Sequence, residues 1–178
     1  MSRAGALLVL VAVPMLLEAR VARRNERVLR AKGAREPPDD VFAIMRIAYP
    51  VCFLAMITEG WYRARGVDEL TVIGVTIFVA AKLLKYWAIA ALGARWSFRV
   101  LVPPESSLVT SGPYRYVQHP NYVAVVGELV GVALAAPAPL TGLLAIVVFG
   151  LVLLARVRSE NRALGIGNRA QSSKTRVL

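Results

Sequence analysis

The sequence predicts an all-α integral membrane protein of about five transmembrane helices, the last two of which form a short helical hairpin. Two observations carry this prediction. The 178 residues are 57% hydrophobic, with a mean hydropathy of +0.55, yet the formal net charge is +11. Such a balance requires apolar and basic residues to be segregated, and long apolar runs do alternate with basic clusters along the chain. The length fits one domain.

The first apolar run covers residues 4–17 and follows Arg3. It is shorter than the roughly 20 residues that a perpendicular span prefers. A cleaved signal peptide is the rival interpretation, but no small-residue cleavage motif ends the run, and the chain continues into a charged helical segment. We therefore expect a first span that is extended by its flanks.

Residues 20–35 are rich in arginine and carry a thin apolar face, and the segment ends at Gly33 and the following Pro37-Pro38. Two interpretations are equally open: an amphipathic helix that lies on an anionic membrane surface, and a solvated loop. The positive-inside rule places either version in the cytoplasm, with the N-terminus outside.

Two further spans are predicted at residues 41–60 and 70–92, joined by a nearly neutral loop that suits the outer side. Lys82 and Lys85 lie in the second half of the later span, on one helix face. We expect them to snorkel toward the cytoplasm; the alternative is that they line the mouth of a cavity.

The last two apolar stretches, residues 122–136 and 140–155, are joined by Pro137-Ala138-Pro139, a connection short enough to require antiparallel neighbours. Glu128 lies within the first arm, where an unpaired charge is costly, so it should face the protein interior and be neutral or paired. The predicted domain is residues 1–164, and residues 165–178 form a disordered tail of small and basic residues.

The span count places the polar connection of residues 93–116 and the C-terminal tail on the cytoplasmic side. We expect the membrane to be a bacterial plasma membrane. Membrane lipids are thus expected partners. Nucleic acid is not, because the basic residues lie beside apolar spans and no nucleic-acid motif is visible. The single cysteine, Cys52, and the single histidine cannot assemble a metal cluster, so no metal is predicted. The oligomeric state cannot be predicted from these patterns.

The stretch from Ser111 to Tyr122 concentrates the histidine with two prolines, a glycine and three tyrosines. Gly112-Pro113 favours a turn, and Pro120 suits the first position of a helix. His119 would then lie at the mouth of that helix beside free N–H groups, a place that suits an anionic group. The alternative is a rigid loop whose tyrosines sit at a membrane interface.

The run Leu-Val-Thr-Ser-Gly-Pro-Tyr-Arg-Tyr-Val-Gln-His-Pro-Asn-Tyr, residues 108–122, resembles the signature of the isoprenylcysteine carboxyl methyltransferase family, which is related to the phospholipid methyltransferases. The likeness covers roughly the C-terminal half, residues 93–164. It implies an integral membrane enzyme that uses S-adenosylmethionine. Two positions depart from the family pattern: Gln118 replaces the usual arginine, and Asn161 replaces the second residue of the usual acidic pair.

The resemblance also implies which residues form the site. The acceptor side should contain Arg156 and Glu160, which are four residues apart and hence on one helix face; the alternative is an ordinary ion pair at the membrane boundary. Ser106 and Ser107 lie close to the expected cofactor site. That site should comprise Leu108, Val109, Tyr114, His119, Pro120 and Tyr122, with His119 as a donor to the cofactor carboxylate and the tyrosines as ring faces.

Methyl transfer from a sulfonium chiefly needs in-line positioning and exclusion of water. We therefore expect an S-adenosylmethionine-dependent O-methyltransferase acting on a lipophilic acceptor such as a prenylated cysteine carboxylate. Phenolic or pyrone lipids derived from polyketides are an open alternative, as is N-methylation of phospholipid amines. A non-catalytic membrane scaffold with the same fold is the alternative outside the enzymes.

Overall fold

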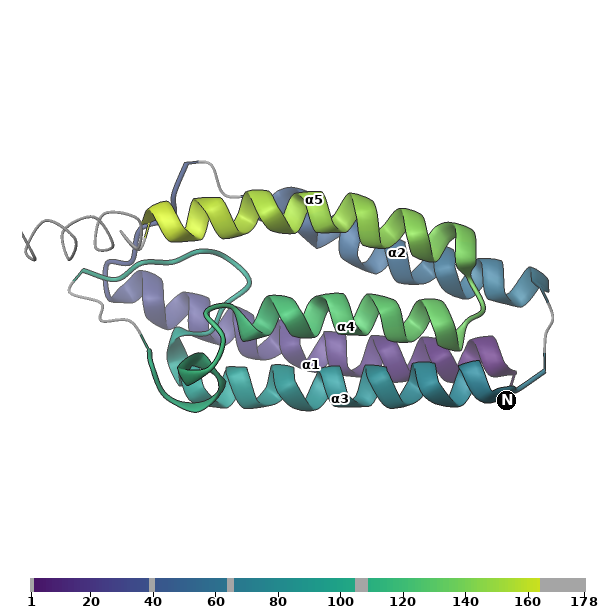
Figure 1. Cartoon of the computed structure of the whole chain (residues 1–178). Helices are drawn as coiled ribbons and strands as arrows, with labels where there is room; N and C mark the ends of the chain where they lie inside the picture. The colour runs from purple at the N-terminus through teal and green to yellow at the C-terminus, as the bar shows by residue number, and fades with distance from the viewer. Residues whose placement is uncertain (1, 39–40, 64–65, 105–108, 164–178) are drawn as a thin grey trace, which may run out of the picture.

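The computed structural model describes residues 2–38, 41–63, 66–104 and 109–163, and within them the chain is helical (Figure 1). Five α-helices follow one another as α1 (Arg3–Ala31), α2 (Phe42–Arg63), α3 (Glu69–Leu92), α4 (Pro120–Ala135) and α5 (Pro139–Ala163). Two short 3-10 helices, η1 (Gly93–Arg95) and η2 (Gly112–Arg115), lie in the connection between α3 and α4. The predicted tail, residues 165–178, lies outside the described residues.

Four of the five described helices, α1, α2, α3 and α5, are long and apolar enough to cross a membrane. The exception is α4, whose 16 residues extend about 24 Å at 1.5 Å per residue. The prediction of an all-α membrane fold with about five helices is confirmed. The second arm of the hairpin is longer than the predicted residues 140–155, because α5 has 25 residues. Its last turns carry Arg156 and Glu160.

The two ends of the bundle differ in what they hold (Figure 1). One end, here called the hairpin end, holds the start of α1, the α2–α3 connection and the α4–α5 turn. There Arg3 of α1 donates to the Thr71 hydroxyl at 2.7 Å and to the carbonyls of Gly66 and Ala135 at 2.8 and 2.5 Å. These bonds join the three segments. The opposite end, here called the loop end, holds residues 93–104 and 109–119 of the α3–α4 connection and the last turns of α1 and α5.

The basic segment after the first apolar run is helical as far as Ala31, as one interpretation predicted, and the solvated-loop interpretation is wrong for residues 20–31. It continues α1 without a break, and the whole helix spans 29 residues. Its inner face is packed: Ala22 and Leu29 are buried, and Asn25 donates to the carbonyls of Gly93 and Trp96 at 3.1 and 2.8 Å. The extension therefore supports the loop end.

A network of four buried charges occupies the middle of the bundle: Glu18 of α1, Lys82 and Lys85 of α3 and Glu128 of α4. Lys82 Nζ lies 2.7 Å from Glu18 and 2.9 Å from Glu128. Lys85 Nζ lies 3.3 Å from Glu18 and 2.7 Å from Glu128. Each lysine thus contacts both carboxylates, and the network carries no net charge. We call it the charge tetrad.

The charge tetrad corrects one prediction and confirms another. Lys82 and Lys85 do not snorkel toward water, because their ammonium groups contact the buried carboxylates of Glu18 and Glu128. Glu128 is paired in the interior, as predicted. Tyr49 adds α2 to the network by donating its hydroxyl hydrogen to Glu128.

The small residues of α3 and α4 let these two helices approach closely. A Cβ added at Gly74 would lie 2.4 Å from the Ala135 nitrogen, and one added at Gly131 would lie 2.7 Å from the Phe78 nitrogen. Close backbone approach through small residues is how helices associate in lipid, where the hydrophobic effect gives no driving force between them. The contact fixes the start of α4 relative to the end of α3.

We expect Glu128→Gln to lower the free energy of unfolding by about 3–5 kcal/mol, because it leaves two buried ammonium groups with one carboxylate. Denaturant or thermal unfolding in detergent measures this loss.

The control is Arg30→Gln, which breaks the exposed pair with Glu36 and should cost no more than about 1 kcal/mol. The double variant Lys82→Met/Glu18→Gln removes one charge of each sign and should be less damaging than either single change. Equal losses for Glu128→Gln and Arg30→Gln would contradict the role of the tetrad.

Candidate active site

The turn before α4 has the conformation that its glycine permits. Gly112 has a φ of +59°, and the chain makes one turn of 3-10 helix before Tyr116. Pro120 then stands at the first position of α4 and is fully buried. The turn and the helix start predicted from Gly112-Pro113 and Pro120 are both present, and they place His119 at the mouth of α4.

A cavity of about 420 Å³ opens at the loop end of the bundle. Ligand pockets of about this size hold cofactors and drug-sized molecules. Most of the residues assigned to the cofactor and acceptor sites line it, and they come from η2, α4, α5 and the stretch before η2. Those lining residues are Val109, Tyr114, His119, Tyr122, Arg156 and Glu160.

One residue predicted for the cofactor site, Pro120, does not line the cavity. Pro120 is packed in the protein as the first residue of α4, so its part is to begin the helix. Leu108, together with Ser106 and Ser107, lies outside the described residues.

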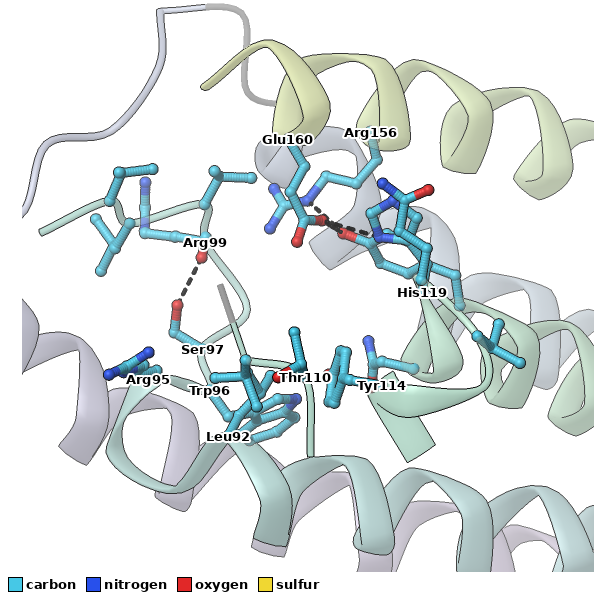
Figure 2. Close-up of a pocket in the computed structure, with 18 of the residues that line it drawn as sticks. Leu92, Arg95, Trp96, Ser97, Arg99, Thr110, Tyr114, His119, Arg156 and Glu160 are labelled. Atoms are coloured by element: carbon cyan, nitrogen blue, oxygen red, sulfur yellow. Dashed lines mark hydrogen bonds and ion pairs between the residues drawn. The ribbon is translucent and has the colours of Figure 1, made fainter. Parts of the chain in front are cut away.

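Figure 2 shows how the cavity is divided. Arg156 and Glu160, from α5, lie beside His119 on one side. Trp96 and Thr110 lie across from them. Side chains from α5, from the start of α4 and from the connection after α3 therefore face one shared space.

Tyr122 connects the two predicted groups of residues. Its hydroxyl donates to Glu160 and accepts from Arg156 Nε at 3.3 Å. Arg156 is buried, and its Nη2 also donates to the Phe98 carbonyl at 2.6 Å. A bonded link thus runs from α4 through α5 to the connection after α3, and it holds the Arg156 guanidinium at the cavity wall.

His119 contacts α5 through both ring nitrogens. Nε2 lies 3.0 Å from Asn161 Oδ1, and Nδ1 lies 3.9 Å from Glu160 Oε2. The imidazole also stacks on the Tyr122 ring, with centroids 5.3 Å apart. Because an amide oxygen only accepts, the Nε2 proton is engaged within the protein. The predicted donation from His119 to a cofactor carboxylate would fall to Nδ1.

Tyr114 lies in the short 3-10 helix η2, and its side chain lines the cavity. Burial raises the pKa of its hydroxyl well above the usual range, and the negative charge of Glu160 raises it further. Tyr114 therefore stays neutral at physiological pH. A neutral phenol in a cavity wall presents a ring face and a hydroxyl donor.

Sequence reasoning missed several cavity residues. Asn121 lines the cavity, and its side-chain Oδ1 is buried without a hydrogen-bond partner among the described residues. Asn121 is the second residue of α4, a position whose N–H has no partner within the helix. Its place within the His-Pro-Asn-Tyr run was the available signal. The connection after α3 adds Arg95, Trp96 and Arg99, for which the sequence offered no motif.

Arg99 is held in place from the α1–α2 connection. Its Nη1 lies 2.5 Å from Glu36 Oε1, and its guanidinium stacks over the Phe42 ring at 4.4 Å. Burial alone would raise the pKa of Glu36, but its hydrogen bonds to Arg99 and Arg30 and their charges outweigh burial and hold the pKa below the usual 4.5. A backbone bridge between Arg35 and Val102 runs alongside.

Residues 72–166 match the model of the isoprenylcysteine carboxyl methyltransferase family, more than half of the chain. The chain belongs to the isoprenylcysteine carboxyl methyltransferase family. This family implies a membrane methyltransferase, and the matched region contains α4, α5 and every predicted site residue. The resemblance predicted from residues 108–122 is confirmed.

Two curated relatives of this family member have nearly the same length. The Bacillus subtilis protein YpbQ, described as uncharacterized, is 29% identical over 158 residues, which are 89% of this chain and 94% of that protein. A Haemophilus influenzae protein, also described as uncharacterized, is 28% identical over 145 residues, 81% of this chain and 84% of that one. No solved structure matches the chain.

The lowered pKa of Glu36 gives a pH-dependent prediction. A carboxyl whose pKa is lower in the folded state stabilises the protein above its unfolded pKa, and this contribution is lost as pH falls through the folded value. Glu36→Gln should therefore cost at most about 1 kcal/mol at neutral pH, since the side chain is partly exposed. The difference from wild type should shrink as the pH falls below 4.5 and vanish once the pH is below the lowered pKa of the folded state. Thermal unfolding of both proteins across this range measures it, and a constant difference at all pH values would contradict the assignment.

Proposed function

We propose that this protein is an S-adenosylmethionine-dependent O-methyltransferase whose acceptor is a lipophilic molecule with an anionic oxygen. The observation that carries the proposal is the convergence of the motif residues with Arg156 and Glu160 on one cavity. A prenylated cysteine carboxylate is the acceptor that the family name suggests. A phenolic or pyrone lipid presents the same anionic oxygen once ionised.

The cavity residues fit S-adenosylmethionine. The unpartnered Asn121 Oδ1 needs a donor, and the amino groups of the cofactor are donors. The Asn121 N–H, together with the positive charges of Arg95 and Arg115, suits the cofactor carboxylate. Val109, Tyr114, His119 and Tyr122 would surround the remainder. When bound, the cofactor supplies a methyl group already activated on its sulfonium.

The acceptor side is the wall formed by α5. The Arg156 guanidinium is fixed by the Phe98 carbonyl and by Tyr122, so it can hold an anionic oxygen with little further loss of side-chain freedom. Glu160 holds the Tyr122 hydroxyl that contacts the arginine. The role of these residues is positioning, because a sulfonium needs no further activation.

The membrane arrangement suits such an acceptor. The loop end carries the exposed arginines of α1, which the positive-inside rule assigns to the cytoplasm, where S-adenosylmethionine is available to the cavity. We propose that this membrane is the bacterial plasma membrane. A lipophilic acceptor would keep its tail in the bilayer while its reactive oxygen meets the cavity.

The first prediction from the proposal concerns the cofactor. Asn121→Leu should raise the unfolding temperature of the ligand-free protein, because a buried acceptor without a partner is removed. The same variant should weaken S-adenosylmethionine binding by about tenfold, since one hydrogen bond is lost. Unfolding scans and calorimetric titration measure the two effects. Unchanged affinity would remove Asn121 from the cofactor site, and failure of the wild type to bind would favour a non-catalytic scaffold.

The second prediction concerns the acceptor side. Arg156→Ala should lower kcat/KM for a lipid acceptor by at least about a hundredfold and leave cofactor affinity nearly intact. Glu160→Gln should act in the same direction with a smaller effect, because the Tyr122 hydroxyl loses a charged partner. The matched control is Arg158→Ala, an exposed arginine on the same helix. Normal turnover in both site variants would leave Arg156 and Glu160 as a structural pair.

A further inference from the structure

One side of α1 is apolar in the first half of the helix and basic in the second. The apolar half of this side consists of the exposed residues Val9, Val13, Leu16 and Leu17. The same helical spacing continues with the exposed residues Arg20, Arg23, Arg24 and Arg27. Because residues three, four and seven positions apart share one side of an α-helix, the two sets form one continuous surface. We call its four arginines the basic stripe.

The basic stripe is turned away from the rest of the bundle. The buried residues of this part of α1, Ala22, Asn25 and Leu29, lie on the opposite side of the helix. In the part of the chain that the structure describes, residues 20–31 form the ion pairs Arg30–Glu36 and Glu26–Arg99, and neither pair includes an arginine of the stripe. Like charges three and four residues apart repel one another. The stripe is therefore costly unless an anion from outside the protein neutralises it.

We propose that the basic stripe binds the headgroups of anionic phospholipids in the membrane that holds the protein. A phospholipid presents apolar chains followed by a phosphate, and this side of α1 changes from valine and leucine to arginine in the same order. Guanidinium groups bind phosphate oxygens through paired N–H donors. A basic cluster beside a membrane span is typical of anionic lipid binding. The apolar half holds the acyl chains next to the arginines, which identifies the partner as a lipid.

The depth of the stripe in the membrane follows from the alignment of α1 with α3. The first residue of α1 donates to Thr71 near the start of α3, and Asn25 donates to the Gly93 carbonyl just past its end. Half-exposed Trp87 lies about 9 Å before Gly93, and Arg20 lies about 8 Å before Asn25, at 1.5 Å per residue. Exposed tryptophans gather at the membrane–water interface. The stripe thus begins at the level of the interface and continues into the headgroups.

The test uses the full-length protein in a neutral detergent, with phosphatidylglycerol as the anionic lipid and phosphatidylcholine as the lipid without net charge. Phosphatidylglycerol should raise the unfolding temperature more than phosphatidylcholine, because a ligand of the folded state stabilises it. In a calorimetric titration, Arg24→Gln should weaken phosphatidylglycerol affinity about fivefold, the factor expected for one basic residue at an anionic surface. The fourfold variant Arg20→Gln/Arg23→Gln/Arg24→Gln/Arg27→Gln should bind the two lipids equally.

The matched control removes the same charge from exposed positions of the loop end that lie outside the stripe. It is Lys32→Gln/Arg35→Gln/Arg46→Gln/Arg158→Gln. This control should keep most of the phosphatidylglycerol affinity, and equal losses in the two fourfold variants would overturn the proposal in favour of a diffuse charge effect. Without lipid, the stripe variant should unfold at the same or a higher temperature than the wild type, because repulsion is removed. A lower temperature would show that the arginines stabilise the protein without a partner and would also overturn the proposal.

Inorganic phosphate separates a lipid from a soluble anion. At the same concentration it should leave the unfolding temperature unchanged, and stabilisation equal to that by phosphatidylglycerol would overturn the assignment to lipid. Equal stabilisation of the wild type by the two lipids would overturn it as well. The residues that line the cavity come from outside α1, so the stripe variant should bind S-adenosylmethionine as the wild type does. The lipid measurements need neither cofactor nor turnover, so their failure is distinguishable from a failure of the proposed function.

Discussion

The charge tetrad is the interaction on which the rest of this structure depends. Removing four charges from water costs several kcal/mol per ion, and only mutual contact offsets that cost. Glu18, Lys82, Lys85 and Glu128 satisfy the condition together, since each lysine contacts both carboxylates. α1, α3 and α4 must therefore keep one register. A slip of one turn, about 5.4 Å, would separate every pair.

That register determines where the site residues lie. α4 carries Glu128 in its middle and begins at Pro120, so fixing Glu128 against α3 also fixes the first turn of α4, which presents His119, Asn121 and Tyr122. The close contacts at Gly74 of α3 and Gly131 of α4 fix the distance between these two helices. α5 is added by a different set of bonds, from Tyr122 and the Phe98 carbonyl to Glu160 and Arg156. The cavity is thus formed where a rigid helix pair meets a third helix.

Sequence reasoning predicted the features that are encoded locally. Gly112-Pro113 specifies its turn and Pro120 its helix start through backbone restrictions of single residues, so both could be predicted without knowing the fold. The alignment of the motif with Arg156 and Glu160 followed from the family pattern. These parts of the site were accessible because each depends on a few neighbouring residues.

The remainder depends on contacts between distant segments. Lys82 and Lys85 were expected to reach for water, because nothing near them in the sequence announces that Glu18 lies beside them in space. The continuation of α1 past Arg20 depends on Asn25 meeting the carbonyls of Gly93 and Trp96. Asn121 reads as an ordinary second residue of a helix until its unpartnered oxygen is seen in a cavity wall.

The electrostatics of the cavity follow from which charges are already neutralised. The tetrad has no net charge, and Arg99 is paired with Glu36, so neither projects a strong field into the cavity. Arg95, Arg115 and Arg156 also line the cavity, together with the carboxylate of Glu160. The excess of arginines over carboxylates among these residues supports the proposed acceptor, which brings a negative oxygen. A protonated lipid amine would be repelled by the same arginines.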